Sequence, residues 1–483
     1  MNAPITTGPH AWSAPVGLED IAPGPDAMVV TDPASGDVIA CVPRLGAAET
    51  GAAIAAAQTA MADWAARPAL ERADVLLAWH AAILAETEAL AQLITAECGK
   101  PLTEARGEVA YGVSYIRWFA EETRRSGGEI IPAPDRGRRM FALPRPVGVV
   151  AAITPWNFPV AMVTRKLAPA LAAGCAVVLK PAPETPLSAL RLAQLAREVG
   201  LPRGLVSVVT GEAVEIGGAM TADPRVAKLT FTGSTEVGRL LIAQSAPTVK
   251  RLSLELGGNA PVLVFDDADL DQAVDGVLAA KFRNAGQTCV CANRIYVQAG
   301  IHDAFAERLA ARAADLRVGP GLEDSVEIGP LISENAIAKT KRHVEDALDG
   351  GGRLLAGGAP HPAGPQLWSP TVIANVAPDA LCTREETFGP LAPIVPFDDE
   401  DVVIAWANAS PFGLAAYLFT RDASRIWRVG EALEAGMVGV NTGLISAAEA
   451  PFGGIKQSGL GREGSRHGLT DYQDLKYFCL ALD

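Results

Sequence analysis

Short apolar runs alternate with helical stretches over residues 147–256, and this alternation constrains the fold more than any other feature of the chain. The runs predict five buried strands, at 147–153, 176–179, 206–209, 228–231 and 251–256. Helices are predicted between them, after Pro159, at 186–199, after Ala213 and at 234–244. Strands that alternate with helices form a parallel sheet with helices on both faces. The chain is therefore predicted to contain a doubly wound domain.

A second alternation begins at Val262, after the glycine-rich break at 257–261, and continues to about Asn441. Its helices include those predicted at 270–282 and 301–315. A chain of 483 residues is too long for one small core, so two or three domains in one body are expected. The predicted fold class is α/β, with two doubly wound parallel-sheet domains and a small β element.

The remaining segments are predicted to be helices and a hairpin. One helix is expected over 47–93 and a second over 102–123. Segment 126–144 resembles an extended hairpin, because it carries glycines and prolines between short β-prone pieces. The tail at 471–478 alternates like an edge strand, and pairing with another subunit is one way to cover such an edge.

Composition and charge exclude several classes of protein. The net charge is -14, which would repel a phosphate backbone, so no nucleic acid partner is expected. The longest apolar run, 167–179, is interrupted by a proline and a glycine and is too short to span a bilayer, so no membrane partner is expected. Residues 1–16 show no secretory signal pattern. The seven cysteines are scattered, unlike a disulfide framework, and a cytoplasmic setting is expected.

Several common site motifs are absent. The six histidines form no paired spacing, and Cys289 and Cys291 have no second cysteine pair, so no metal site is predicted. There is no G-x-S-x-G nucleophile motif. Residues 459–464 match G-x-G-x-x-G, but they follow no buried strand and too little chain remains for a dinucleotide-binding unit. They are predicted to form a flexible loop.

Cys289 lies among small and polar residues in the stretch 282–291. A cysteine near glycine is frequently a small buried apolar residue, and the alternative is a nucleophile. Since no histidine pattern accompanies it, a nucleophile here would depend on a carboxylate or a water relay as its base. The stretch alone leaves both interpretations open.

Two further residues are candidates for catalysis. Glu255 stands between two leucines, and apolar surroundings raise the pKa of a carboxylate towards that of a general base. A carboxylate satisfied in a turn is the alternative. Asn157 lies in a loop that Pro155 and Pro159 make rigid, and a rigid amide donor suits an oxyanion hole.

A phosphate site is predicted where the strand at 228–231 ends and the next helix begins. Gly233 allows a close backbone approach, Ser234 is a good N-cap, and the helix N-terminus favours an anion. The lysine of a P-loop is missing, which counts against hydrolysis of nucleoside triphosphates. Lys180 ends another strand, where open α/β sheets bind ligands. An ordinary turn and a solvated lysine are the respective alternatives.

Six motifs in this order together resemble the aldehyde dehydrogenase superfamily, and the resemblance covers nearly the whole chain. They are Thr154–Pro159, Phe231–Gly238, Leu254–Gly258, Gly286–Cys291, Glu386–Pro390 and Pro451–Gly454. The strings Lys281–Asn293 and Gly443–Gly461 are most similar to the succinate-semialdehyde dehydrogenase branch.

The resemblance implies a mechanism of aldehyde oxidation. Cys289 would attack the aldehyde carbon as a thiolate, and the Asn157 amide and the Cys289 backbone N–H would hold the oxyanion. Hydride would pass to a nicotinamide and leave a thioester, and Glu255 would activate the water that releases the acid. A non-enzymatic relative is disfavoured because all three residues are present.

The resemblance also implies a cofactor, NADP or NAD. Its expected binding residues are Trp156, Lys180, Pro183, Gly233, Ser234, Glu386 and Phe388. Where NAD-preferring relatives commonly carry a glutamate that repels a 2′-phosphate, this chain has Pro183. NADP is therefore expected to be tolerated or preferred, although Glu184 could oppose it.

In the branch, residues that match Arg165, Arg283 and Ser446 hold a carboxylate at the far end of the substrate. A guanidinium binds a carboxylate well and rejects an uncharged aldehyde. The expected reaction is oxidation of succinate semialdehyde to succinate, as in 4-aminobutyrate degradation. Glutarate semialdehyde and broader aliphatic aldehydes are alternatives, and each arginine could instead form a structural ion pair.

Cys291 carries a separate expectation from the same branch, a reversible disulfide with Cys289 under oxidation. A packing cysteine is the alternative. No metal is implied.

The resemblance finally implies a division into parts and a homodimer or homotetramer. A cofactor-binding domain would comprise 1–125, 145–256 and 443–467, a catalytic domain 257–442, and an oligomerisation element 126–144 and 468–483.

Overall fold

The first predicted alternation forms a six-stranded sheet in the computed structural model, which describes residues 10–482. Its strands are β8 (Val149–Ile153), β9 (Ala176–Lys180), β10 (Val206–Val208), β11 (Val226–Thr232), β12 (Arg251–Glu255) and β22 (Gly459–Leu460). Their order is β10-β9-β8-β11-β12-β22. The chain starts at β8, adds β9 and β10 on one side, and then β11 and β12 on the other. Ligands bind at the carboxyl ends of strands where such an order reverses, here between β8 and β11.

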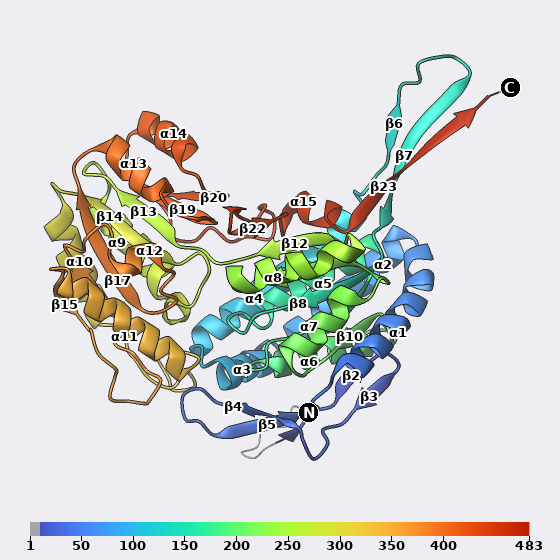
Figure 1. Ribbon diagram of the computed structural model, residues 1–483, viewed down its shortest axis with the longest axis horizontal. Coiled ribbons are helices and arrows are strands. Elements are labelled where there is room, and N and C mark those ends of the chain that lie inside the picture. Colours follow the sequence, from blue (N-terminus) through green and yellow to red (C-terminus); the bar gives the residue numbers. More distant parts are fainter. Residues whose placement is uncertain (1–9, 483) are drawn as a thin grey trace.

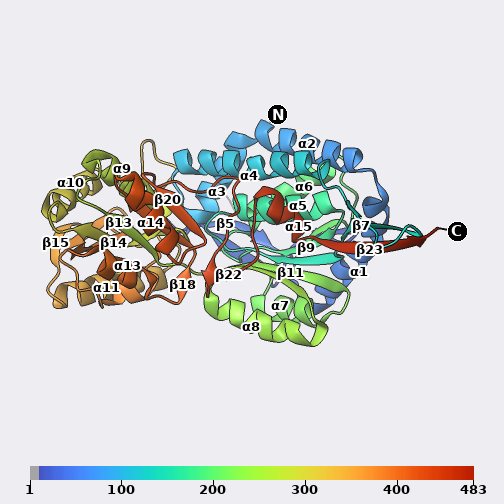
Figure 2. The same ribbon diagram turned by 90° about the horizontal axis from the view of Figure 1, so that it is seen from above.

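Helices cover both faces of this sheet. They are α5 (Ala161–Ala173), α6 (Pro186–Glu198), α7 (Ala213–Ala222) and α8 (Thr235–Ser245). Figure 2 shows α5 and α6 on one side of the sheet and α7 and α8 on the other. The predicted doubly wound domain is therefore confirmed.

The single helix predicted over 47–93 is wrong, because this stretch forms α1 (Ala47–Ala66), α2 (Ala69–Ala85) and α3 (Thr87–Cys98). Pro68 explains the first break, since a residue that precedes proline is disfavoured in the helical conformation. Arg67 accordingly has an extended backbone. Helix α4 (Leu102–Thr123) has the predicted bounds. Within residues 10–482, no helix is both long and apolar enough to cross a membrane.

The second alternation forms a seven-stranded sheet. Its strands are β13 (Ala260–Val264), β14 (Ala292–Gln298), β15 (Arg353–Ala356), β16 (Thr371–Ala374), β17 (Leu391–Phe397), β19 (Ala415–Phe419) and β20 (Met437–Val440), in the order β15-β16-β17-β14-β13-β19-β20. Its helices are α9 (Leu270–Phe282), α10 (His302–Ala314), α11 (Glu334–Asp349), α12 (Leu381–Arg384), α13 (Glu400–Asn408) and α14 (Ala423–Ala432). Both sheets are parallel except at one edge, where β15 and β22 run antiparallel to their neighbours.

An arm of three strands projects from the first lobe (Figure 1). Strands β6 (Glu129–Ile131) and β7 (Arg138–Pro146) form the predicted hairpin, and β23 (Gln473–Ala481) pairs with β7 along its whole length. The predicted edge strand of the tail is thus confirmed, because β23 is the outer strand of this sheet.

The N-terminal segment adds small sheets to the first lobe. They are built from β1 (His10–Ala11), β4 (Met28–Thr31) and β5 (Val38–Val42), and from the hairpin of β2 (Ala14–Val16) and β3 (Glu19–Ile21). Most of segment 1–16, which carries the expectation about a secretory signal, lies outside the described residues.

The two lobes meet end to end, because β12 leads into β13 through only four residues. The carboxyl edge of the first sheet therefore faces the amino edge of the second, as Figures 1 and 2 show. The chain returns to the first lobe at β22, which pairs with Leu254 and Glu255. The backbone N–H of Leu256 donates to the Ser458 carbonyl at 2.9 Å, and the Ser458 hydroxyl donates to the Gly257 carbonyl at 2.7 Å. The flexible loop predicted at 459–464 is wrong, because this stretch completes the sheet.

Candidate active site

The junction of the two lobes holds a cleft of about 270 Å³. The first lobe contributes the loop after β8, with Trp156 and Asn157, and the turn after β11, with Gly233 and Ser234. The second lobe contributes the segments that precede β14 and β17. Their lining residues are Cys289, Glu386 and Phe388. Residues far apart in the sequence thus meet because the sheet edges face each other.

Cys289 is partly exposed to this cleft, on a loop of unusual backbone conformation. Asn284 and Ala285 have φ angles of 51° and 54°, in the left-handed region, which bends the chain sharply before the cysteine. A Cβ atom at Gly258 would lie 2.3 Å from the Cys289 carbonyl oxygen, so only glycine permits this approach. Burial raises the pKa of the Cys289 thiol to about 12. A thiolate here therefore needs a base or a nearby positive charge.

Asn157 is held at both its side chain and its backbone. Its Nδ2 donates to the Gln287 carbonyl at 3.0 Å, in the loop that leads to Cys289. Its own carbonyl accepts a hydrogen bond from Asn284 Nδ2 at 3.1 Å. One N–H of the Asn157 amide is used in this way, which leaves the other for a group in the cleft.

Glu255 ends β12 and is buried, with one carboxyl oxygen unpaired among the described residues. Burial and the neighbouring Glu463 raise the pKa of Glu255 well above its ordinary value, while Arg165 and Lys166 oppose this. A Cβ atom at Gly453 would lie 2.9 Å from Glu255 Oε1, so the backbone approaches the carboxyl group closely. Such an environment moves the pKa of a carboxyl group towards the range that suits a general base.

Glu463 is a functional candidate that the sequence did not reveal. It follows β22 and forms ion pairs with Arg165 and Lys166 beneath the cleft. Although burial opposes ionisation, these two cations lower the pKa of Glu463. Its position depends on the pairing of β22 with β12, and no local pattern in 459–464 signals that pairing.

Under the mechanism that the resemblance implies, we expect the rate of thioester hydrolysis to rise with pH through the pKa of Glu255. Because burial raises the pKa of this carboxyl group, the ionised form that can accept a proton from water becomes more abundant as the pH rises. Single-turnover measurements over about pH 6 to 10 distinguish this pH-dependent rise in the hydrolysis rate from the rate of hydride transfer. Glu255→Gln should abolish the rise with pH and slow hydrolysis by about 100- to 10,000-fold. An unchanged pH profile in Glu255→Gln would show that another group acts as the base.

The first-lobe side of the cleft fits a dinucleotide. Ser234 is the N-cap of α8 and accepts from the Val237 N–H at 3.3 Å, so a helix N-terminus opens at the cleft. A Cβ atom at Gly233 would lie 2.4 Å from the Phe231 ring. The Thr232 hydroxyl is buried without a hydrogen-bond partner among the described residues, which leaves it available to a ligand.

The second-lobe side of the cleft supplies an acid, a base and an aromatic ring. Glu386 accepts from the Gly258 N–H at 3.0 Å, and burial raises the pKa of Glu386 to about 7. Phe388 has a φ of 54° and meets Trp156 edge to face, with ring centroids 5.7 Å apart. Lys339 of α11 also lines the cleft and was not foreseen from the sequence, because a lysine on an amphipathic helix gives no local signal.

Lys180 and Pro183 lie at the carboxyl end of β9, outside this cleft. Lys180 is 2% exposed and its Nζ donates to the Pro181 carbonyl at 2.9 Å. Burial lowers the pKa of Lys180, while Glu184 and Glu212 raise it. Pro183 is exposed. Glu212, paired with Arg44, is a second acid near Lys180 that the sequence did not reveal.

Arg165 forms a structural ion pair, which was the alternative to substrate binding. However, part of its guanidinium has no hydrogen-bond partner among the described residues. It is completely buried, contacts Glu463, and lies over the Phe452 ring at 4.3 Å. Both of its terminal nitrogens lack a hydrogen-bond partner among the described residues. A buried guanidinium with free N–H groups is costly unless a ligand completes it.

Arg283 lines a second pocket of about 620 Å³, and its guanidinium lies 5.4 Å from the centre of the Phe158 ring. Arg165 and Arg283 both act to lower the pKa of Cys289 against the effect of burial, which places both charges within electrostatic reach of its sulfur. Ser446 is partly buried and lines neither of the two pockets.

Cys291 is buried and has an unexpected neighbour. Lys281 Nζ lies 3.3 Å from its sulfur and 2.8 Å from Asn293 Oδ1. This lysine, on the last turn of α9, was not singled out in the sequence.

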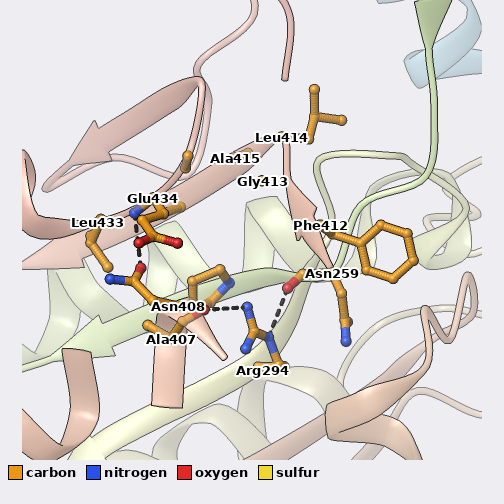
Figure 3. Close-up of a pocket in the computed structure, with 13 residues that line it drawn as sticks. Asn259, Arg294, Ala407, Asn408, Phe412, Gly413, Leu414, Ala415, Leu433 and Glu434 are labelled. Atoms are coloured by element: carbon orange, nitrogen blue, oxygen red, sulfur yellow. Dashed lines mark hydrogen bonds between the residues drawn. The ribbon is translucent and has the colours of Figure 1, made fainter. Parts of the chain in front are cut away.

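A different hollow surrounds Arg294 in the second lobe (Figure 3). Its volume is about 10 Å³, which is room for roughly one water molecule. Arg294 donates to the backbone carbonyls of Asn259, Trp406 and Ala407. This hollow is therefore part of the framework and not a substrate site.

Comparison with known proteins agrees with this geometry. Residues 21–478 match the Aldehyde dehydrogenase family. The 3-sulfolactaldehyde dehydrogenase of Pseudomonas putida is 56% identical over 464 residues, 96% of both chains. Succinate-semialdehyde dehydrogenase [NADP(+)] GabD of Escherichia coli (strain K12) is 56% identical over 95% of both chains. A glutarate-semialdehyde dehydrogenase of Pseudomonas aeruginosa is 55% identical over 93% of both chains.

The fold is also similar to that of solved structures. The crystal structure of succinate-semialdehyde dehydrogenase from Burkholderia pseudomallei superposes with a TM-score of 0.97, covers 100% of both chains and is 53% identical. The resemblance predicted from the motifs and the predicted fold class are both confirmed. The chain, with a cysteine, an amide and a carboxyl group gathered between two facing sheets, belongs to the aldehyde dehydrogenase family.

Proposed function

We propose that the protein oxidises succinate semialdehyde to succinate with NADP or NAD. The observation that carries the proposal is Arg165, a buried guanidinium with unpaired N–H groups within electrostatic reach of Cys289. Such a group is completed by an anion at the far end of the substrate. The names of the relatives support this, since succinate semialdehyde, glutarate semialdehyde and 3-sulfolactaldehyde each carry an acid group.

In the proposed mechanism, the Cys289 thiolate attacks the aldehyde carbon. The free N–H of Asn157 and the backbone N–H of Cys289 stabilise the negative charge that develops on oxygen. When the hemithioacetal loses hydride, a thioester to Cys289 remains. Glu255 then takes a proton from water, whose oxygen attacks the thioester and releases the acid and the thiol.

The cofactor site follows from the fit described above. Ser234 and the α8 N-terminus would bind the pyrophosphate, Glu386 the nicotinamide ribose, and Lys180 the adenosine ribose. Gly233 permits the backbone approach, and Trp156 and Phe388 wall the nicotinamide end. An oxidised nicotinamide, when bound, would supply the hydride acceptor.

We propose that NADP is accepted at least as well as NAD. Pro183 offers no carboxylate to a ribose 2′-hydroxyl, so nothing at this position repels a 2′-phosphate. Glu184 and Glu212 lie near Lys180 and act in the opposite direction. The NADP-named relative from Escherichia coli supports the proposal.

A substrate panel with both cofactors tests the proposed function. The panel contains succinate semialdehyde, glutarate semialdehyde, 3-sulfolactaldehyde and butyraldehyde. We expect the highest kcat/KM for succinate semialdehyde and a loss of about 100-fold or more for butyraldehyde, which leaves the buried arginine unpaired. One extra methylene changes the free energy by only about 1–3 kcal/mol, so glutarate semialdehyde is the closest competitor. Equal use of butyraldehyde would overturn the proposal of an acid-bearing substrate.

We also propose that the arm pairs subunits into a homodimer or homotetramer. Its three-stranded sheet exposes apolar side chains, namely Ile130, Leu475, Tyr477 and Leu480. In this proposal the first lobe acts as the cofactor-binding domain and the second lobe as the catalytic domain. Light scattering that gives the 50.2 kDa mass of one chain would contradict it.

A cytoplasmic setting and a redox role for Cys291 complete the proposal. All seven cysteines are free thiols. Oxidation would join Cys291 to Cys289 as a disulfide and block the nucleophile until a thiol reductant restores it.

A further inference from the structure

We infer that Lys100 is a positioning residue for the oxyanion site, acting through the backbone of Asn157. The inference rests on the proposed role of Asn157. Lys100 lies between α3 and α4 and is 1% exposed, so it is a buried cation outside the cleft. Its Nζ donates to the Asn157 carbonyl at 2.9 Å.

Lys100 is held in this position by a buried carboxylate. Its ammonium forms an ion pair with Glu108 of α4, and both side chains are almost completely buried. The other carboxylate oxygen of Glu108 accepts from the N–H groups of Val160 and Ala161, at 2.8 and 3.2 Å. Glu108 thereby caps the amino end of α5, where the helix dipole favours a negative charge. The pair ties α4 to the Asn157 carbonyl and to the amino end of α5.

Three hydrogen bonds hold Asn157 in place. Lys100 and Asn284 donate to its carbonyl, and its side-chain amide donates to the Gln287 carbonyl. The ammonium also lies 3.7 Å from the centre of the Phe158 ring, which fixes the residue after Asn157. Loss of Lys100 would leave the Asn157 backbone held by Asn284 alone. The side-chain amide would keep its bond to the Gln287 carbonyl, but the less restrained backbone would let the amide shift from the position proposed for the oxyanion contact.

A close packing of helices makes this reach possible. A Cβ atom at Gly112 of α4 would lie 2.8 Å from the Val160 side chain. Glycine at this position therefore brings α4 against the start of α5, four residues along the helix from Glu108. The Glu108 carboxylate can then bind the N–H groups at the start of α5 and the Lys100 ammonium at the same time.

The test compares Lys100→Met, Asn157→Ala and the double variant. We expect Asn157→Ala to lower kcat by about 100- to 1,000-fold, as for removal of an oxyanion donor. Lys100→Met should lower kcat by about 10- to 100-fold, with a change in the aldehyde KM of less than about threefold. In the double variant, kcat should lie within about threefold of that of Asn157→Ala, because both changes remove the same interaction. Losses that multiply would overturn the inference.

Lys100→Met leaves Glu108 buried without its cation, which destabilises the fold. A second variant therefore separates loss of stability from loss of the contact with Asn157. The pair Lys100→Met with Glu108→Gln removes both charges and keeps an oxygen for the α5 N–H groups. We expect the same loss of kcat from this pair, since the donor to Asn157 is still missing. Recovery of wild-type kcat would show that only charge balance mattered and would overturn the inference.

Lys250 provides a matched control. It is also a buried lysine that donates to backbone carbonyls, those of Asp223 and Val226, but it lies at the opposite end of β12 from Glu255. Lys250→Met should lower the Tm and leave kcat within about twofold. A loss of kcat in Lys250→Met equal to that of Lys100→Met would overturn the inference.

The design separates this inference from the proposed function. All rates are measured with whichever aldehyde the wild-type enzyme turns over fastest, so the identity of the substrate does not enter. An unchanged kcat in Asn157→Ala would refute the proposed oxyanion site itself. A slow Asn157→Ala beside an unchanged Lys100→Met would refute the role of Lys100 alone.

Discussion

Cys289→Ala is expected to lower the formation of reduced nicotinamide cofactor by about 10,000-fold or more, because a variant that lacks the nucleophile keeps only binding and oxyanion contacts. Cys289 is the cysteine that lines the cleft. Cys291 cannot replace it, since its sulfur is buried against Lys281. The measurement is the initial rate of cofactor reduction, with thermal unfolding to establish that the fold persists. A residual rate within about tenfold of wild type would exclude Cys289 as the nucleophile.

Cys291→Ala is the matched control for this variant. It changes a cysteine two residues away and is expected to retain kcat. Under the proposed redox role, it should also lose any inhibition by peroxide that dithiothreitol reverses. If that reversible inhibition persists in Cys291→Ala, the disulfide between the two cysteines does not form.

Arg283→Ala is expected to lower kcat/KM for succinate semialdehyde by about 100-fold, mainly through KM. The guanidinium lies against the Phe158 ring at the wall of the larger pocket, and it contributes a positive charge felt at Cys289. Under the proposed function, its removal leaves the carboxylate of the substrate with one cation fewer. For butyraldehyde, which has no carboxylate, kcat/KM should change by less than about threefold. Equal losses for the two aldehydes would rule out a carboxylate-binding role.

Arg317→Ala is the control for charge at the same pocket. Arg317 lines it too, but its side chain is 64% exposed and faces Glu327 at 4.0 Å. An exposed pair of this kind contributes little. Both aldehydes should therefore be used by Arg317→Ala as by the wild type. Arg165→Ala is a less clean variant, because it would leave Glu463 with Lys166 as its remaining ion-pair partner.

The sheets and the reacting residues were within reach of the sequence because their signals are local. The apolar runs at 176–179 and 251–256 are short and flanked by turn residues, and they became β9 and β12. Asn157 and Ser234 were recognisable because a proline-bounded loop and an N-cap follow predicted strands. The break between α1 and α2 has an equally local signal in Pro68, although the helical periodicity predicts a single helix there.

The residues that were missed act through contacts distant in sequence. Glu463 reaches Lys166 and Arg165 across 297 and 298 positions, only because β22 pairs with β12. Lys100 reaches Asn157 across 57 positions through the packing of α4 on α5. The residues next to Glu463 and Lys100 in the sequence do not distinguish them from a glutamate or a lysine on a solvated surface. Their roles follow from tertiary packing, which no periodicity encodes.

The second lobe is topologically an insertion whose two ends lie side by side. The chain leaves the first lobe after Glu255 and re-enters it at Gly459, and these two residues are partners in one antiparallel pair. Leu256, Gly257 and Ser458 bind one another at the crossing. The lobes are also joined at a second place, where the Asn157 side-chain amide donates to the Gln287 carbonyl and the Asn284 backbone N–H donates to Glu104. The position of the loop that carries Cys289, relative to the first lobe, is therefore set both at the tied crossing and at these contacts.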